Sequence, residues 1–142
     1  MKVVYKPLTP KEWPEVHAAI HCIPMPDTRG VVAFGEDGGI LACGVADTFS
    51  FTGCQVHLWI NNPLVIRHGF LNEIFHYIFV TCDRLVIVGM VPGNNSKALR
   101  FNRHLGYTEV ARIPDGFNFG VDYVIMQMKR EECRFIRLEE AA

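Results

Sequence analysis

The chain has 142 residues, 49% of them apolar, with 14 Lys and Arg against 15 Asp and Glu. This length suffices for one hydrophobic core and is short for two, so we expect a single domain over residues 1–142. A formal charge of −1 creates no overall field for nucleic acid or an anionic membrane, which argues against both as partners. No apolar run approaches the roughly 18 residues of a membrane span, so we expect a soluble, cytoplasmic protein.

The cysteines and histidines are not arranged as a known metal motif. The cysteines are odd in number and none are spaced as Cys-x-x-Cys, which argues against a disulfide framework and a zinc site. Reduced, mostly buried thiols are expected at Cys22, Cys43, Cys54, Cys82 and Cys133. His17 and His21 have a spacing able to grip a metal, but no HExxH frame and no third ligand accompany them, so no metal is predicted.

The first third of the chain predicts a strand, a helix and a hairpin. Residues 2–6 alternate as a short strand, and Thr9-Pro10-Lys11-Glu12 has the pattern of a helix start, with a Thr N-cap, Pro at the first helical position and Glu three residues after the cap. Residues 23–27 contain two prolines and predict a loop. Strands are then expected at 30–35 and 40–47, joined by a turn at 36–39.

The middle of the chain predicts a right-handed βαβ unit. Residues 54–61 alternate in polarity, with one apolar side and one side that carries polar groups. The apolar side carries Val56, Leu58 and Ile60, and the other carries Gln55, His57, Trp59 and Asn61. A helix follows Pro63, with its apolar stripe at Leu71, Ile74, Phe75, Ile78, Phe79 and Cys82. The β-branched run at 85–88 is typical of a parallel strand covered on both faces.

The last third predicts a short helix and two strands. Residues 92–96 form a turn that ends in a helix cap, and the helix stops at Leu105, where Gly106 suits a left-handed C-cap. A strand at 107–113, a turn at 114–116, a strand at 121–128 and a charged tail from Lys129 complete the chain. The predicted order is β-α-β-β-β-α-β-α-β-β.

That order resembles the GNAT superfamily of N-acetyltransferases, and the match in order covers nearly the whole chain. Residues 95–107, NSKALRFNRHLGY, are similar to the family segment N-x-x-[AS] … l-G-[FY], and the final strand resembles that of small bacterial or phage-borne members. The resemblance implies an α/β fold. Its central twisted sheet would be mostly antiparallel with one parallel βαβ unit, and helices would cover both faces.

The resemblance implies acetyl-CoA as cosubstrate, with its diphosphate held at residues 66–72. The family pattern there is roughly [QR]-x-x-G-x-[GA], whereas this chain has one glycine, one position early. Backbone amides at a strand-to-helix turn suit a phosphate, and Arg67 can add a charge-assisted contact. The predicted cofactor residues in this turn are Arg67, His68, Gly69, Phe70 and Leu71.

Further cofactor contacts follow from the same resemblance. Backbone amides around Ile60 and Asn61 are expected to pair with the pantetheine arm and to polarise the thioester carbonyl. Asn95 is expected to cap its helix, with a contact to the CoA arm as a second role, and Arg103 lies on a basic helix surface that is either a solvated face or a phosphate contact. The family tyrosine that protonates the departing thiolate corresponds to Asn102, and its absence costs only about 2 kcal/mol near pH 7.

The reaction requires a base, because the acceptor amine is protonated near neutral pH. His57 is the first candidate, against the alternative of a half-buried structural histidine. Gln55 can only hold a water molecule, and Tyr123 on a late strand is a third candidate. Tyr107 is expected to pack in the core after its glycine.

The sequence therefore predicts an acetyl-CoA-dependent N-acetyltransferase that acts on an amine of unidentified structure. The alternative is a catalytically silent GNAT-shaped module that binds an acyl-CoA or a protein. Modification of nucleic acid has only the basic helix surface in its favour. The segment Cys133-Arg134-Phe135-Ile136 leaves room for a homodimer contact.

Overall fold

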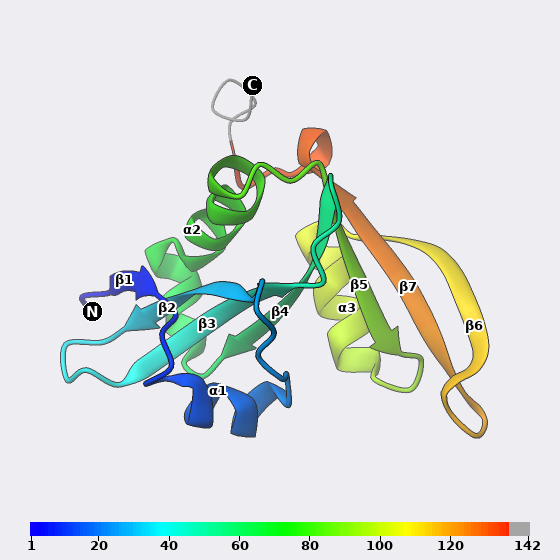
Figure 1. Cartoon of the computed structure of the whole chain (residues 1–142), viewed down its shortest axis with the longest axis horizontal. Helices are drawn as coiled ribbons and strands as arrows, with labels where there is room; N and C mark the ends of the chain where they lie inside the picture. The colour runs from blue at the N-terminus through cyan, green and yellow to red at the C-terminus, as the bar shows by residue number, and fades with distance from the viewer. Residues whose placement is uncertain (137–142) are drawn as a thin grey trace.

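A mixed sheet of seven strands carries the fold, in the order β1-β2-β3-β4-β5-β7-β6 (Figure 1). The structure is a computed structural model that describes residues 1–136. The strands are β1 (Val4–Pro7), β2 (Arg29–Phe34), β3 (Ile40–Asp47), β4 (Gly53–Ile60), β5 (Val86–Pro92), β6 (Thr108–Asn118) and β7 (Val121–Lys129). Within the described chain, β4 and β5 form the one parallel pair, and every other pairing is antiparallel. The predicted order of elements and the predicted fold class are confirmed.

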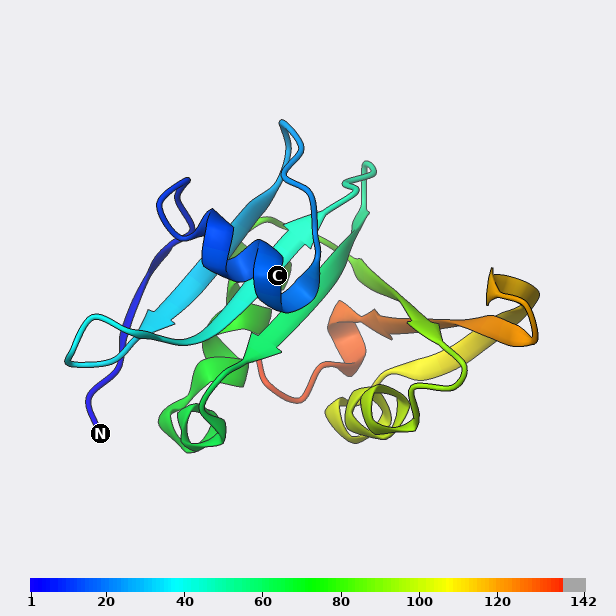
Figure 2. The same cartoon turned by 90° about the horizontal axis from the view of Figure 1, so that it is seen from below.

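Helices cover both faces of the sheet (Figure 2). On one face lies α1 (Trp13–Ile20), which buries Val16 against β2 and β3. On the other face lie α2 (Phe70–His76), its π-helical continuation η2 (Tyr77–Thr81) and α3 (Ser96–Leu105). Short 3-10 helices precede α2 and follow β7, namely η1 (Pro63–His68) and η3 (Arg130–Glu132).

The stripe predicted for the second helix faces the larger part of the core. Its six apolar side chains are all buried. Close packing of α2 on the sheet depends on Gly44 of β3, since a Cβ at that position would collide with the side chain of Ile74. Strand, helix and strand are thereby joined as the βαβ unit that the sequence predicts.

The first helix begins later than predicted. Glu12 accepts from the Thr9 backbone amide and hydroxyl, each at 2.9 Å, so the contacts of a capping box form. They close a turn, however, and the helix starts only at Trp13. The reason is Pro14, which has no N–H to bond the carbonyl of Pro10 and is tolerated only in a first helical turn.

The turn predicted at 114–116 is wrong. β6 continues to Asn118, and the hairpin reverses at Phe119 and Gly120, where Gly120 has φ 72°. Residues 114–116 form an irregularity within the strand pairing. Asp115 has φ 55°, and its carboxylate accepts from the Gly120 amide at 2.6 Å. The residues that predicted a turn therefore form a bulge next to the tip of the β6–β7 hairpin.

The segment predicted as a dimer contact packs against its own chain. Cys133 is buried, and the Phe135 ring stacks on Phe75 with ring centres 5.2 Å apart. Asn72 donates to the Phe135 carbonyl at 3.0 Å. Residues 137–142, the end of the predicted charged tail, lie outside the described residues.

The cysteines agree with the expectation of reduced thiols. All five cysteines are free and buried. Among residues 1–136, none of the helices combines the length and apolar character needed to cross a membrane.

Candidate active site

The sheet opens between its two parallel strands. The pairing of β4 with β5 covers only Gly53–Gln55 against Val86–Val88. Beyond it, β4 continues to Ile60 alongside β3, and β5 continues to Pro92 alongside β7. Figure 2 shows the two strands diverging from this short shared stretch. The inner edge of each strand is therefore left without the other as a hydrogen-bonding partner.

Along β4, the backbone N–H and C=O groups of every second residue point toward this opening. The Asn61 amide donates to the Leu41 carbonyl of β3 at 2.9 Å. Because successive residues of a strand point their N–H and C=O groups to opposite edges, the groups of Ile60, Leu58 and Val56 face the β5 side. Of the two amides predicted to meet pantetheine, that of Asn61 is thus engaged with β3, and its side chain also donates, to Ile40 O at 2.9 Å.

Side chains of β4 divide between the two faces as the alternation predicts. Val56, Leu58 and Ile60 pack toward the α2 and α3 core, and Trp59 packs on the α1 side. Gln55 and His57 share the face of Trp59. The polar side chains that β4 contributes to the opening therefore lie on the α1 face.

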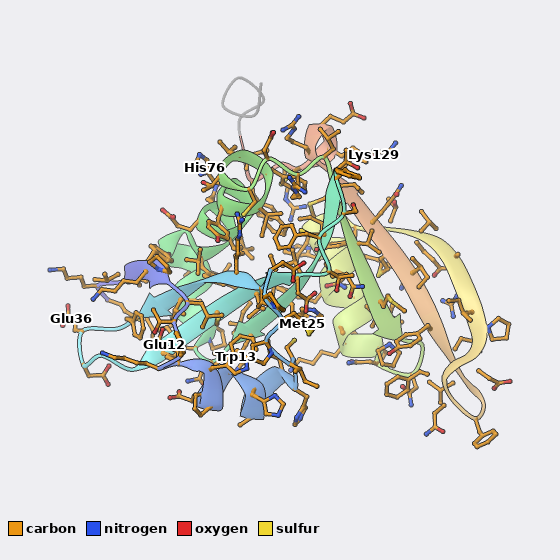
Figure 3. All side chains as sticks on the ribbon, viewed as in Figure 1. Glu12, Trp13, Met25, Glu36, His76 and Lys129 are labelled. Atoms are coloured by element: carbon orange, nitrogen blue, oxygen red, sulfur yellow. The ribbon has the colours of Figure 1, made fainter. Side chains whose placement is uncertain are left out.

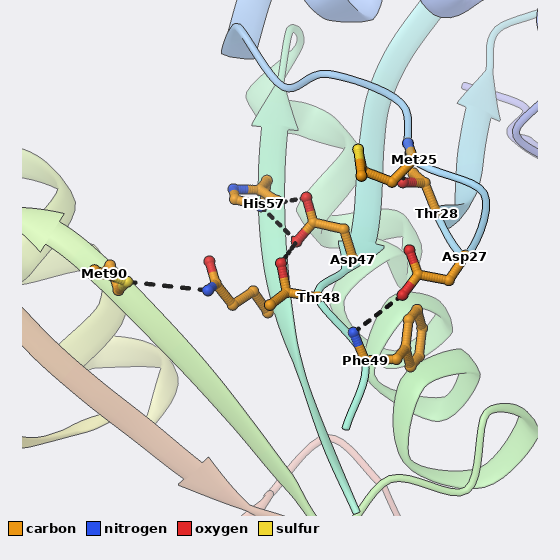
Figure 4. A network of polar contacts seen from close by, with 9 residues as sticks. Met25, Asp27, Thr28, Asp47, Thr48, Phe49, His57 and Met90 are labelled. Atoms are coloured by element: carbon orange, nitrogen blue, oxygen red, sulfur yellow. Dashed lines mark hydrogen bonds and ion pairs between the residues drawn. The ribbon is translucent and has the colours of Figure 1, made fainter. Parts of the chain in front are cut away.

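His57 is hydrogen-bonded to Asp47 at the end of β3 (Figure 4). The His57 Nε2 atom lies 3.1 Å from both carboxylate oxygens. A carboxylate can only accept, so Nε2 carries a proton, and in the neutral imidazole the lone pair is then on Nδ1. The His57 side chain is 33% exposed and that of Asp47 only 14%, so the ring is open to solvent while its partner is shielded.

The sequence pattern placed residue 47 in a strand but did not predict its contact with His57. Asp47 pairs with Gln55 and lies diagonally opposite His57 on the same face of the sheet. The missing information was the β3–β4 register, which the composition of the two strands does not fix. An acidic residue ending the strand before a histidine-bearing strand was the available signal.

The other two predicted catalytic residues lie on the same face of the sheet. Gln55 Nε2 approaches the Met90 sulfur of β5 at 3.9 Å and so bridges the start of the opening. Tyr123 pairs with Pro92 at the far end of β5, and its ring meets Phe117 edge-on at 5.5 Å. His57, Gln55 and Tyr123 share a face, with Tyr123 lying two strands beyond β4.

The turn predicted to hold the diphosphate is mostly helical. Asn62 caps η1 by accepting from the Leu64 amide at 3.0 Å, and Gly69 separates η1 from α2 with φ 84°. The Gly69 amide is engaged by the carbonyls of Val65 and Ile66. A Cβ built at Gly69 would meet no atom within 4 Å, so the glycine serves the backbone conformation and the space beside it is open.

Side chains around this turn differ in exposure. Arg67 and His68 are exposed, and the His68 carbonyl accepts from the Tyr5 hydroxyl at 2.8 Å. Phe70 and Leu71 are buried in the core, so only their backbone groups are available to a ligand. Arg67 is therefore the side chain of this turn best placed for an anion.

The third helix begins and ends as predicted. Asn95 Oδ1 accepts from the Ala98 amide at 3.1 Å, and Gly106 ends the helix with φ 114°. Arg103 is paired with Glu109 at 3.4 Å, and Glu109 also binds Arg112 at 3.0 Å, so the predicted phosphate contact of Arg103 competes with an ion pair. Those arginines lower the pKa of the Glu109 carboxyl, with the Arg112 hydrogen bond as the largest cause.

Asn102 lies beneath β5 on the α3 side. Its amide nitrogen is 3.9 Å from the Met126 sulfur and 3.9 Å from where a Cβ of Gly89 would stand. Tyr107 is buried beside it, as predicted, and burial raises the pKa of its hydroxyl. The absent side chain at Gly89 leaves Asn102 close to the β5 backbone.

Comparison with known proteins finds likeness in structure and none in sequence. No family model matches the chain, and no curated protein is similar to it in sequence. Among solved structures, a mutant of the spermidine N-acetyltransferase SpeG from Vibrio cholerae has a TM-score of 0.77 at 10% identity over 96% of this chain and 98% of its own. The same enzyme in complex with CoA and spermine has a TM-score of 0.74 at 12% identity, covering 92% and 96%.

A further structure of that Vibrio cholerae enzyme, described as dodecameric, has a TM-score of 0.73 at 12% identity over 91% of this chain and 94% of its own. Identity this low carries the architecture alone. The mixed sheet, with one parallel pair among the described residues, and the helices around it agree with that likeness. The chain has the fold of the GNAT N-acetyltransferases.

Proposed function

We propose that the protein is an acetyl-CoA-dependent N-acetyltransferase that transfers an acetyl group directly to an amine. The observation that carries the proposal is the opening of the sheet after Gln55 and Val88. From there on, every second residue of β4 points its backbone N–H and C=O groups toward β5, which no longer pairs with them. The pantetheine arm of CoA is an extended chain with two amides. Such a chain can add to a free strand edge by main-chain hydrogen bonds, as peptides do.

The β4 edge also suits the chemistry of the thioester. Backbone N–H groups of Val56, Leu58 and Ile60 are fixed by the sheet before any ligand arrives. An N–H group aimed at the thioester oxygen stabilises the negative charge that develops there during attack. One of the structurally similar enzymes was solved with CoA and spermine, which supports CoA and an amine as the pair to test.

His57 and Asp47 supply the base. Asp47 holds the imidazole through Nε2, so the lone pair of Nδ1 is free to take a proton from the acceptor ammonium. The neutral amine then attacks the thioester carbon, a C–N bond forms, and the C–S bond breaks. The amine nitrogen loses its second proton, and the CoA thiolate gains one to leave as a thiol. Asp47 stabilises the imidazolium that forms in between.

Asn102 is proposed to stabilise the departing sulfur in place of a general acid. Its side-chain N–H groups lie under β5 near Gly89, on the α3 side of the opening. An amide can donate a hydrogen bond to a thiolate but cannot protonate it. The proton then comes from solvent, at the modest cost expected for a thiol near neutral pH.

The diphosphate is proposed to lie over residues 66–72. The support is the open space beside Gly69 and the exposed guanidinium of Arg67. Asn95 and Arg103 on α3 remain proposed contacts to the rest of the cofactor. Both already have partners within the chain, so they rank below Arg67.

A homodimer is proposed along β6 instead of through residues 133–136. β6 is an edge strand that is exposed along its whole length, with apolar Val110, Ile113 and Phe117 at the surface. A long exposed edge of this kind is a template for strand pairing, and a second copy of the chain offers the same edge. Sedimentation tests the proposed dimer. The wild type is expected to sediment as a dimer and Ile113→Lys as a monomer, because the substitution places a charge on the β6 surface.

Release of free CoA thiol tests the function directly. The protein would be incubated with acetyl-CoA and a panel of amines that begins with spermidine and spermine and extends to smaller amines and peptides. Amine-dependent thiol release is expected, with loss of roughly a hundredfold in kcat/KM in His57→Gln. Binding is measured separately, because acetyl-CoA at about 100 times its Kd stabilises a fold by about 2.7 kcal/mol.

The outcomes separate the enzyme from the silent module. A thermal shift with acetyl-CoA but no thiol release with any amine favours the module. If millimolar acetyl-CoA causes neither a thermal shift nor thiol release, the proposed function is rejected. The oriented His57–Asp47 pair favours turnover, since a module that only binds needs no base.

A further inference from the structure

Three side chains that commonly bind metals meet beside the opening, each from a different segment. Cys22 follows the C-cap of α1, Asp47 ends β3 and His57 lies in the middle of β4. Their ligand atoms, one sulfur, one carboxylate oxygen and one imidazole nitrogen, all lie within 4.8 Å of one another. Cys22 is buried and the other two are half-buried, so the group is partly shielded from water.

Local structure holds each of the three in place. The β3–β4 register puts Asp47 and His57 on one face. His21 ends α1 in the left-handed conformation, with φ 56°, which turns the chain back toward the sheet. His17 Nδ1 then bonds the Cys22 carbonyl at 2.7 Å and fixes the backbone that carries the thiol.

We propose that Cys22, Asp47 and His57 form a binding site for Zn²⁺, with three protein ligands and a fourth position open to water. Sulfur, imidazole nitrogen and carboxylate oxygen are the ligands that zinc uses, whereas magnesium and calcium prefer oxygen alone.

The distances are close to those that zinc needs. Zn–N and Zn–O bonds of about 2.0–2.1 Å place the ligands of a tetrahedral site roughly 3.3 Å apart. His57 Nε2 and the Asp47 oxygens are already 3.1 Å apart. The sulfur lies within 4.8 Å of the other two ligand atoms and needs a separation of roughly 3.5 Å, because Zn–S bonds are about 2.3 Å long, so it has to move by at most about 1.3 Å. Rotation of the Cys22 side chain about its Cα–Cβ bond can supply this movement while the backbone stays in place. Zinc deprotonates a coordinating thiol, so a neutral Cys22 is no obstacle.

The site differs from the metal pair weighed in the sequence. His17 and His21 lie on α1 with their rings 6.1 Å apart, and the Nδ1 of His17 is engaged by a carbonyl. Cys22 stands next to them in the chain, but its two co-ligands are 25 and 35 residues away. Only the folded sheet brings the three together, which explains why spacing predicted no metal.

Zinc at this site would block the base. Zinc would take the lone pair of Nε2, and a neutral imidazole bound in this way carries its proton on Nδ1, so the atom proposed as the base would no longer have a lone pair. Zinc would also take up the Asp47 carboxylate that is proposed to stabilise the imidazolium. We therefore expect reversible inhibition of acetyl transfer by zinc. This consequence depends on the proposed function, whereas the binding itself does not.

Cobalt(II) provides a readout that requires no activity. Co²⁺ added to the chelator-treated full chain is expected to bind one ion per chain, with intense visible bands of tetrahedral geometry and a near-ultraviolet thiolate-to-cobalt band. Zn²⁺ is expected to displace it. Cys22→Ser is expected to abolish the thiolate band, and Asp47→Asn and His57→Gln to weaken Zn²⁺ binding at least about tenfold in competition with a chelating dye.

Matched controls distinguish this site from adventitious binding. His21→Asn removes the exposed neighbouring imidazole and keeps a residue that tolerates the left-handed cap, and Cys133→Ser removes a buried thiol elsewhere; both are expected to leave the cobalt spectrum unchanged. A spectrum without a thiolate band, or one that survives Cys22→Ser or disappears in His21→Asn, overturns the site. Circular dichroism checks that each variant folds, and the isosteric Asp47→Asn keeps the test open if Cys22→Ser does not.

The activity arm is separate. In the wild type, zinc is expected to inhibit thiol release by at least tenfold, with recovery on addition of EDTA, and the ratio of rates with and without zinc is expected to approach one in Cys22→Ser. If the protein binds cobalt at this site but acetylates no amine, the metal site is supported and the proposed function is rejected. If the protein acetylates an amine but does not bind cobalt in tetrahedral geometry, the proposed function is supported and the metal site is rejected.

Discussion

Asp47 and His57 stand diagonally across β3 and β4, with both carboxylate oxygens 3.1 Å from the imidazole Nε2. This contact fixes which ring nitrogen carries the proton and leaves the other free at the surface of the opening (Figure 4). The proposed proton transfer requires such a nitrogen, on a ring that its neighbour holds in place.

Asp47→Asn is expected to lower kcat/KM for acetyl transfer by roughly ten- to a hundredfold, mainly through kcat. The amide keeps the shape of the side chain but no longer stabilises an imidazolium, and its N–H group can favour the wrong tautomer. Initial rates of thiol release at varied amine concentration separate kcat from KM. Asp27→Asn is the control, because Asp27 accepts from the Phe49 amide at 3.3 Å and does not contact His57; a change under twofold is expected there.

Side-chain alternation and helical periodicity predicted the fold well, because each acts within one element. The alternation in β4 and the apolar stripe of α2 can be read from consecutive residues of the sequence. Figure 3 shows the side chains that project from the helices and strands of the folded chain. The Asp47–His57 pair and the Cys22 thiol depend on register and on a left-handed helix cap, which are tertiary properties. The engaged amide of Asn61 and the continuation of β6 past Pro114 likewise depend on neighbouring strands.

Gly44→Ala is expected to destabilise the fold by about 1–3 kcal/mol. The added methyl group would collide with Ile74 of α2, which is fully buried and has no free space to move into. Urea unfolding followed by circular dichroism measures the change. Gly39→Ala is the matched control, since its methyl group would meet only the flexible carboxylate of Asp37 at 3.1 Å. Equal losses in both variants would contradict this packing argument.

Arg67→Ala is expected to weaken CoA binding about five- to twentyfold, through loss of a charge-assisted contact to the diphosphate. Calorimetry with CoA and with acetyl-pantetheine, which lacks the diphosphate, isolates that contribution. Only the affinity for CoA should fall. Lys11→Ala removes a positive charge on the α1 side of the sheet and is expected to change neither affinity. A parallel loss for both ligands would place Arg67 away from the phosphates.

Stability is expected to fall in alkali because two thiols are held neutral in the core. Burial is the largest cause that raises the pKa of both Cys43 and Cys54 to about 12, from an ordinary value of 9.0. Between these pH values the folded chain holds protons that the unfolded chain has released. The stabilisation is therefore complete below about pH 9 and is lost as pH rises toward 12, by at most about 1.4 kcal/mol per pH unit and thiol.

Urea unfolding at a series of pH values from 8 upward tests whether buried thiols cause this alkaline loss of stability. The variants compared are Cys43→Ala and Val45→Ala. Both substitutions shorten a buried side chain of β3, so both lower the free energy of unfolding at pH 8. Only Cys43→Ala also removes a proton from the folded state, and its loss of stability per pH unit above pH 9 should be smaller than that of Val45→Ala. Identical slopes in the two variants would mean that the alkaline loss arises elsewhere, for instance at the buried tyrosine hydroxyls.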